Sequence, residues 1–232
     1  MPMRLPLSLL AVIAFCALQT TPRAIADIPS GEHANLTEVL RREYTQKVSA
    51  ASEVIQQSFK GYQSNPVAYD RFLDTHMEPL WDMRSTTQGL VGRPSFNTLT
   101  HVQANALERA TTRTFRRYAF EGLARYTGQS FAVHNVLVNA QGTRGWVQVV
   151  MRSDSMLNVY LDLLVKRGLD RQWRTVDVRF QGIAYVATKK YMYRTALQSG
   201  PVAALIDTLR EKNVQFFSEL CARHAVEGEK LC

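Results

Sequence analysis

Three acidic residues in the first half of the chain, Asp70, Asp74 and Glu78, fall at four-residue spacing. On a helix this spacing brings the three carboxylates to one face, where they could share a proton or hold a cation. The same spacing is routine on the solvated face of an exposed helix. We therefore interpret these acids as a solvated face rather than as a catalytic or metal-binding group.

Asp177 is the acidic residue for which burial would matter most, because it lies between Val176 and Val178 in a predicted strand. A carboxylate taken out of water needs a hydrogen-bond or charge partner. We expect that partner to be structural, such as the backbone amide of a turn or an arginine. His134, also in a predicted strand, is interpreted as a core or surface histidine rather than as a base.

Familiar catalytic and metal-binding patterns do not occur in the sequence. It contains no H-E-x-x-H pair, no G-x-S-x-G elbow and no Walker-type glycine loop. The histidines are scattered, without the spacing of paired metal ligands: His33, His76, His101, His134 and His224. We therefore expect no metal site, no cofactor and no catalytic residues, and we interpret the protein as a non-enzyme.

The spacing of apolar residues predicts helices in the first half of the chain. Leu36 and Leu40 begin a run of three- and four-residue steps that lasts to Phe59. A second helix begins at Pro66, a favourable residue for a first helical turn, and the longest begins at Thr100. The helices are expected over residues 36–59, 66–77, 83–92 and 100–126.

After Gly128 the apolar period changes from about 3.6 to 2, which predicts strands. Turn-forming residues separate four such segments at intervals typical of an antiparallel meander. The strands are expected at Phe131–Val138, Trp146–Met151, Leu157–Lys166 and Trp173–Phe180. Helical spacing then returns over 186–197 and 202–216. This order predicts an α+β fold, in which a four-stranded antiparallel sheet is covered by amphipathic helices.

Both faces of the predicted sheet are rich in apolar residues, as in the run of Val147, Val149 and Val150. A sheet that is apolar on both sides needs cover on both sides, or a ligand on one. The longest helix also carries a row of basic residues: Arg109, Arg113, Arg116 and Arg117. Exposed aromatic residues do not alternate with them, so we expect no nucleic-acid partner.

The first 26 residues have the pattern of a secretory signal peptide. Arg4 gives a positive start, Leu5–Leu18 is an apolar run, and Ala24-Ile25-Ala26 forms a small-x-small cleavage site. The run is shorter than the roughly 20 residues that a membrane-spanning helix needs. We expect export to the periplasm of a Gram-negative bacterium, with residues 27–213 forming a single domain and 214–232 a C-terminal extension.

The leader contains Arg4, Arg23 and no acidic residue, so its removal lowers the formal net charge from +8 to +6 (26 basic against 20 acidic residues). A moderately basic secreted protein suits an anionic partner or a lipid surface, or the charge simply serves solubility. Cys221 and Cys232 lie beyond the leader, in a chain expected to reach a compartment where disulfides persist. Their spacing permits a bridge that would staple only the tail, and it is not the C-x-x-C spacing of a redox motif.

Lys189, Lys190 and Arg194 are expected near a pocket mouth or docking face, where they would meet anionic headgroups or acidic partner residues.

Two consecutive stretches in the second half of the chain carry a family resemblance. Trp173–Val178 reads WRTVDV, and Gly182–Lys189 reads GIAYVATK. They resemble the MlaC family of periplasmic phospholipid-binding proteins, also called toluene-tolerance proteins. Gly200–Asn213 is similar to the ending of that family. The resemblance covers residues 36–213, which is most of the chain beyond the leader.

Upstream, Pro79 with Asp82, and the LVGR turn at Leu90–Arg93, also resemble the family. The sequence departs from the family pattern at three places: Ala184, where the family has serine, Pro94-Ser95, and the tail beyond Asn213. The run ATKK from Ala187 is similar to the related HpnM branch, which is associated with hopanoid lipids.

The resemblance implies a cone-shaped fold of the nuclear-transport-factor type with extra helices. Lipid tails would enter a dry pocket between the sheet and the helices, where each buried CH₂ contributes about 0.8 kcal/mol. It implies a carrier, expected to be monomeric, that shuttles phospholipid or hopanoid between an outer-membrane lipoprotein complex and an inner-membrane ABC transporter. The expected lipid-binding residues are apolar or aromatic: Trp81, Met83, Phe115, Tyr118, Val147, Val149, Met151, Leu161, Leu163, Val165, Val176, Val178 and Tyr193.

Two other classes of function stay open at this point. One is an enzyme on the same fold that uses Asp177 or His134 as a base in the pocket, and the other is a structural adaptor of an envelope complex. An apolar cavity favours the carrier, a polar hydrogen-bonded cavity favours the enzyme, and a filled core favours the adaptor.

Overall fold

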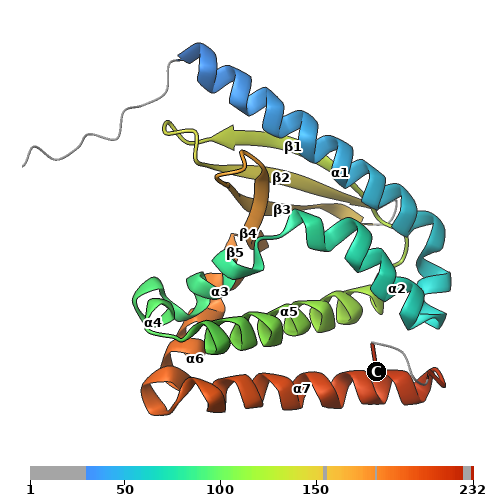
Figure 1. Ribbon diagram of the computed structural model, residues 1–232. Helices are drawn as coiled ribbons and strands as arrows, with labels where there is room; N and C mark the ends of the chain where they lie inside the picture. The colour runs from blue at the N-terminus through green and yellow to red at the C-terminus, as the bar shows by residue number, and fades with distance from the viewer. Residues whose placement is uncertain (1–29, 154–155, 181, 227–230) are drawn as a thin grey trace, which may run out of the picture.

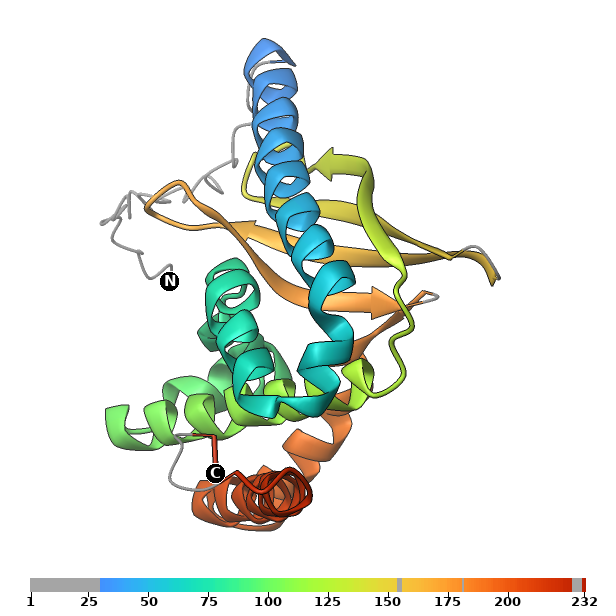
Figure 2. The same ribbon diagram turned by 90° about the vertical axis from the view of Figure 1, so that its right-hand side faces the viewer.

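The computed structural model describes residues 30–153, 156–180, 182–226 and 231–232. The signal peptide expected at residues 1–26 lies outside the described residues. A long helix lies along one face of an antiparallel sheet, and most of the other helices gather beyond one edge of that sheet (Figure 1 and Figure 2). This arrangement confirms the α+β fold expected from the sequence.

The sheet is an antiparallel meander in the order β1-β2-β3-β4-β5. Its strands are β1 (Ser130–Val138), β2 (Arg144–Ser153), β3 (Met156–Arg167), β4 (Trp173–Phe180) and β5 (Ile183–Ala184). The four predicted strands are therefore confirmed. The sequence did not predict β5, which forms because Gly182, with a φ of +82°, lets the chain turn back so that Ile183 pairs with Phe180.

The long helix α1 (Ser30–Ser64) packs on the sheet through a single apolar row. Four side chains at four-residue steps form this row and are buried: Leu36, Leu40, Tyr44 and Val48. Such steps keep residues on one helical face, as the sequence predicted. The hydroxyl of Tyr44 also lies 3.0 Å from Oγ1 of Thr175, which ties α1 to β4.

The remaining α-helices are α2 (Pro66–Phe72), α3 (Met83–Val91), α4 (Arg93–Asn97), α5 (His101–Leu123), α6 (Tyr185–Ser199) and α7 (Val202–Arg223). The Thr100 side chain caps α5 as part of a capping box with Gln103. The helix expected over 66–77 is interrupted, because after Phe72 the chain forms a π-helical turn and then a short 3₁₀ helix, Glu78–Leu80. No helix within the described residues is both long and apolar enough to cross a membrane.

Two core clusters hold the helices together beneath the sheet. In one, Leu90 of α3 and Leu107 of α5 pack with Leu205 of α7. In the other, Phe72 and Phe120 pack with Phe217 near the end of α7. The helices α5 and α7 lie side by side in both views of the molecule (Figure 1 and Figure 2).

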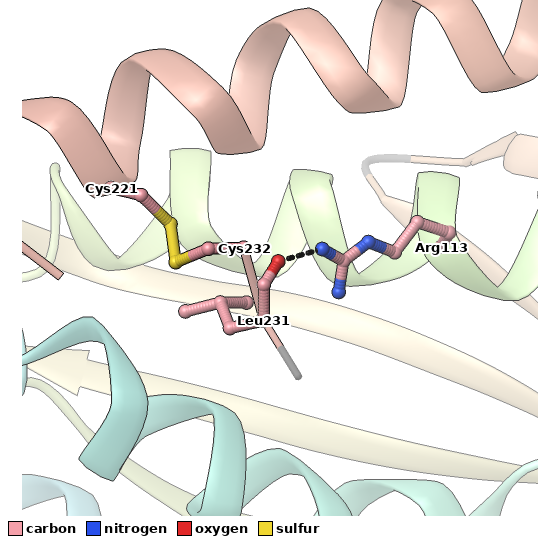
Figure 3. Close-up of a disulfide and its surroundings, with 4 residues drawn as sticks. All are labelled: Arg113, Cys221, Leu231 and Cys232. Carbon is pink, nitrogen blue, oxygen red and sulfur yellow. Dashed lines mark hydrogen bonds between the residues drawn. A yellow bond between two sulfur atoms is a disulfide. The ribbon is translucent and has the colours of Figure 1, made fainter. Parts of the chain in front are cut away.

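The C-terminal end of the chain folds back onto α5. Cys221 and Cys232 form a disulfide, so the bridge that their spacing permits is present. The bond holds Leu231 in the core cluster around Phe217, where its side chain is 2% exposed, and Arg113 donates a hydrogen bond to the Leu231 carbonyl (Figure 3). The guanidinium of Arg113 also lies 3.6 Å from the centre of the Phe217 ring.

Candidate functional site

The sheet face that α1 covers carries two rows of apolar side chains, each with one residue per strand. Register partners on neighbouring strands project from the same face of a sheet. The first row is Val136, Val147, Leu163 and Val178, and the second is Val133, Val149, Leu161, Phe180 and Ile183. Each row begins beneath α1 and continues toward the edge formed by β4 and β5.

From β2 onward, burial decreases along these two rows. Val147 and Val149 are 0% and 4% exposed and belong to the core cluster beneath α1. Leu163, one strand further, is partly exposed. At the far edge Phe180 and Ile183 are 46% and 67% exposed. Helix α1 therefore covers only one end of the apolar face, and the other end is open.

The predicted sheet residues divide along the same gradient. Val165 is fully buried with Val147 and Val149, so these three form packed core. Leu161 and Leu163 lie at the margin of that core, and Val178 is partly exposed opposite Leu163. Met151 lies on the same face of the sheet next to the second row, partly exposed opposite Phe131. Tyr193 is buried among the helices, with its hydroxyl near that of Tyr185. Met83, partly exposed at the start of α3, lies elsewhere.

A bulge in β4 separates Val176 from Val178. Thr175 pairs with Val165 and Asp177 with Leu164, which leaves Val176 without a register partner. Strict alternation would put Val176 and Val178 on one face. The extra residue instead directs Val176 toward the opposite face of the sheet, where it lines a surface depression together with Leu164.

Helix α3 is attached at this bulge. The Asp82 amide donates a hydrogen bond to the Thr175 carbonyl at 2.8 Å, and the Thr86 hydroxyl donates to the Val176 carbonyl, also at 2.8 Å. The carbonyl groups of Thr175 and Val176 at the bulge thus accept hydrogen bonds from Asp82 and from Thr86 of α3. Asp82 also accepts a hydrogen bond from the Ser85 amide and so caps the helix that it precedes.

Asp177 has the structural partner that the sequence led us to expect. Its Oδ1 accepts hydrogen bonds from the amides of Val186, at 3.0 Å, and Val178, at 2.8 Å. The Val186 amide lies in the first turn of α6, where backbone N–H groups have no partner within the helix. Burial raises the pKa of the Asp177 carboxyl, while the two amides oppose this shift. The residue anchors α6 to β4.

An aromatic group lies between the sheet edge and helices α5 and α6. Trp81 contacts Phe115 edge to face at 5.2 Å between ring centres, and Tyr185 contacts Phe115 at 4.9 Å and Tyr118 at 5.8 Å. The Trp81 backbone forms a bridge with Thr175 of β4, so the group joins the sheet. The indole N–H donates to the Thr86 hydroxyl at 2.8 Å and fixes the ring. The structure thus brings together the three predicted residues Trp81, Phe115 and Tyr118.

Tyr185 was missing from the predicted set, as were Phe180 and Ile183. All three lie close to Gly182, which begins the second of the two stretches that resemble the family. The turn returns the chain as β5 and starts α6 directly after it, which places Tyr185 beside α5. A sequence signal for these residues therefore existed in the glycine followed by an apolar pair.

Several polar atoms around the aromatic group form no hydrogen bond of ordinary geometry in the described part of the chain. They are the hydroxyl oxygens of Tyr185, Tyr193 and Thr111 and Nε of Arg117. Burial raises the pKa of the Tyr185 hydroxyl, and it raises the pKa of Tyr193 to about 12. Both hydroxyls are therefore protonated at neutral pH and can donate a hydrogen bond to an oxygen atom of a ligand.

The acids Asp70, Asp74 and Glu78 were expected to form a solvated face, and Asp74 and Glu78 are indeed exposed, but Asp70 is largely buried. All three carboxylates converge on Arg116 of α5, with contacts of 2.6 Å from Asp70 and 2.6 Å from Glu78. The side chains of Arg116 and Asp70 are only 15% and 13% exposed. The row of acids and the row of arginines that the sequence showed separately thus contact each other. The spacing within either row could not predict this contact.

Charged residues line two surface depressions of the structure. One, of about 280 Å³, is the depression next to Val176, and the other, of about 450 Å³, adjoins the Arg116 cluster. Neither has the apolar lining that we expected of a pocket for lipid tails. Among the described residues, no group of three or more histidine, cysteine, aspartate or glutamate side chains is placed to hold a metal ion.

Comparisons with known proteins agree with the arrangement of sheet and helices. Residues 45–211 match the family model described as MlaC protein. A solved structure titled as the phospholipid-binding protein from Ralstonia solanacearum in complex with a phospholipid has a similar fold, with a TM-score of 0.63 and 22% sequence identity. The match covers 74% of this chain and 97% of that one. No curated protein matches the chain.

Proposed function

This chain belongs to the MlaC family, and from that premise we propose that it is a periplasmic phospholipid carrier rather than an enzyme. The observation that carries the proposal is the apolar face that α1 leaves uncovered between Leu163 and Ile183. Exposed apolar surface of this kind is costly in water and marks a binding site. A phospholipid is also the ligand in the similar Ralstonia solanacearum structure.

Lipid tails would lie against the open end of the two apolar rows and under the aromatic group. The residues that we assign to the tails are Leu161, Leu163, Val178, Phe180, Trp81, Phe115, Tyr118 and Tyr185. A dozen CH₂ groups buried there would contribute roughly 10 kcal/mol before the cost of ordering the chains. Val147, Val149 and Val165 would pack as core beside the lipid site and hold the strands together.

The hydroxyls of Tyr185 and Tyr193 would meet the polar part of the same lipid. A buried hydroxyl without a partner costs about 1–3 kcal/mol, and an ester carbonyl of the ligand would remove that cost. The tails would then be held by apolar contacts, and the ester region by protonated hydroxyl groups. No nucleophile or base is needed for this task, and it is the family match that supports a carrier over an enzyme.

We further propose that the protein acts in the periplasm as a monomer and moves lipid between an outer-membrane lipoprotein complex and an inner-membrane ABC transporter. The leader pattern at residues 1–26 supports export. The Cys221–Cys232 disulfide supports an oxidising compartment. The cargo class is proposed as phospholipid, with a hopanoid as the alternative that the run at Ala187 suggests.

A transfer assay tests this function. Lipid-free protein would be mixed with donor vesicles of phosphatidylethanolamine and phosphatidylglycerol, separated from them, and offered to empty acceptor vesicles. A carrier brings phospholipid into the vesicle-free fraction and then delivers it to the acceptors. If the vesicle-free fraction holds no lipid and the acceptors gain none, the carrier proposal is wrong.

A further inference from the structure

A basic depression lies on the face of the sheet opposite to α1. Its position follows from alternation, since Val165 points into the core beneath α1 while Leu164 and Lys166 line the depression. The full lining, around a volume of about 280 Å³, is Ser85, Gln88, Gly89, Gly92, Arg93, Arg144, Leu164, Lys166, Val176, Asp177, Val186, Lys190 and Arg194. It thus contains five basic side chains and one carboxylate. We call it the basic depression.

Separate elements bring the five cations together. Arg144 and Lys166 face each other across β2 and β3, and Arg93 begins α4. Lys190 and Arg194 are four residues apart on α6 and so share one helical face. No local sequence run could therefore reveal the cluster. The sequence did predict a shared role for Lys190 and Arg194, whereas Lys189 does not line the depression.

The fold positions two of these cations closely. The Lys166 ammonium donates a hydrogen bond to the Ser85 hydroxyl at 3.1 Å, which holds it against α3. The Arg194 guanidinium lies on the backbone of Gly92, where an added Cβ would be 2.9 Å from its Nη2. Gly92 also has a φ of +86°, which few other residues adopt. The glycine therefore makes room for the arginine.

The basic depression differs in its carboxylate partners from some arginines elsewhere in the described part of the chain. Arg84, Arg116 and Arg179 each form an ion pair with a carboxylate. In the described part of the chain, no carboxylate forms an ion pair with any of the five cations of the basic depression. Asp177, the carboxylate of the lining, already accepts two backbone amides. Like charges gathered in one concave site repel each other unless an anion joins them.

We propose that the basic depression binds a phosphate group. Guanidinium groups match the geometry of phosphate oxygens with paired hydrogen bonds, and lysine adds point charge. The Ser85 hydroxyl and the Gln88 amide add neutral donors to the same wall. Leu164, Val176 and Val186 add apolar side chains to the lining, among the five cations. The site therefore suits a phosphate ester and not an acyl chain.

The phosphate can come from a lipid headgroup at a membrane surface or from a free phosphate ester. The proposed site is distinct from the one for lipid tails, because it lies across the sheet from the apolar rows. Its occupancy therefore does not depend on the carrier function. A site for a headgroup would orient the protein on an anionic membrane with the opposite face turned away from it.

The test compares two pairs of substitutions that remove the same charge. The double substitution Lys190→Gln with Arg194→Gln removes the two cations that α6 contributes to the depression. The double substitution Lys189→Gln with Lys212→Gln removes two cations outside it. Binding is measured by calorimetry with inorganic phosphate and glycerol phosphate, and by flotation with phosphatidylcholine vesicles with and without phosphatidylglycerol. Arg93→Gln, on a different helix, gives a second variant of the site should the α6 pair fail to fold.

We expect saturable binding by the parent protein in at least one arm, weakened about tenfold or more by the variants of the depression and little by the control pair. Binding of the soluble esters alone identifies a free ester as the source. Binding to phosphatidylglycerol vesicles identifies a lipid headgroup. Absence of binding in both arms, or equal weakening in the control pair, would overturn the proposal. The lipid that co-purifies with the protein should be unchanged in all variants, which separates this test from that of the carrier function.

Discussion

Leu163 and Val178 stand opposite each other on β3 and β4, and both project from the sheet face that α1 only partly covers. Val147, the partner of Leu163 on its other side, has no exposed area at all. Along this row the boundary between packed core and open apolar face therefore falls between Val147 and Leu163, although Val165, further along β3, is still buried. This boundary determines which substitutions should affect cargo and which should affect stability.

Replacing Leu163 with tryptophan should displace lipid while the fold is retained. The larger ring would occupy the space that we assign to the tails, and the partly exposed site can accept it without strain. We expect a clear loss of co-purified phospholipid, measured as lipid phosphorus per protein, with little change in melting temperature. Normal lipid content together with marked destabilisation would show that Leu163 is ordinary core.

Val149→Trp is the matched control for that variant. Val149 is 4% exposed beneath α1, so a larger side chain has no room there. Overpacking of a filled core costs about 1–3 kcal/mol in the free energy of unfolding. The expected result is lower stability in urea denaturation, with lipid per folded molecule close to that of the parent. A Val149→Trp protein that is stable but lipid-free would move the tail site beneath α1.

Tyr185→Phe should weaken lipid binding without lowering the stability of the protein. The Tyr185 hydroxyl is buried beside Tyr118 and forms no hydrogen bond of ordinary geometry among the described residues, so its removal should leave the lipid-free protein equally stable or stabilise it by up to about 1 kcal/mol. Retention of lipid should weaken if the hydroxyl contacts the ester region. Tyr44→Phe is the control, since its hydroxyl contacts Thr175 and its loss should cost about 1 kcal/mol. Equal destabilisation by the two changes would contradict our interpretation of Tyr185.

Arg116→Met should destabilise the protein by about 1–2 kcal/mol, because it leaves the largely buried carboxylate of Asp70 without its partner. The value is below that of a fully buried pair, since Asp74 and Glu78 are about half exposed. Arg210→Met, in an exposed pair with Asp207, should change stability by less than about 0.5 kcal/mol. Chemical denaturation of both variants checks the difference, and equal values would mean that the acidic cluster is not structural.

Substituting serine for both Cys221 and Cys232 should lower the free energy of unfolding by about 2–4 kcal/mol. The bond closes a short loop and holds Leu231 in the core. Leu231→Ala, which keeps the disulfide, should also destabilise, by about 2–5 kcal/mol. If the serine variant melts like the parent in oxidising buffer, the tail does not contribute to the fold.

Local patterns were sufficient to predict most elements of this fold. The period of two located the four long strands, and four-residue steps located the buried face of α1, because both signals come from neighbouring residues on one element. Thr100 was likewise predicted to begin the longest helix, and it caps α5 together with Gln103. Features that depend on one extra residue or on a single glycine were missed. The bulge at Val176 shifted the alternation, and Gly182 created β5.

The site could be predicted only in part, because its decisive features are long-range. Trp81, Phe115 and Tyr118 were in the predicted set and do meet, whereas the apolar pattern of β2 and β3 could not tell which valines α1 would cover. The acids from Asp70 to Glu78 paired with Arg116, which lies on another helix. The basic depression likewise assembles residues from several elements.

Lipid extraction from the protein as it is made in the cell tests the central claim most directly. The chain would be secreted to the periplasm, purified without detergent, extracted with organic solvent and analysed by mass spectrometry beside the Leu163→Trp variant. We predict phospholipid in the parent protein and much less of it in the variant. A hopanoid in place of phospholipid would change the cargo but keep the carrier. A parent protein that is folded, monomeric and free of any lipid would contradict the account.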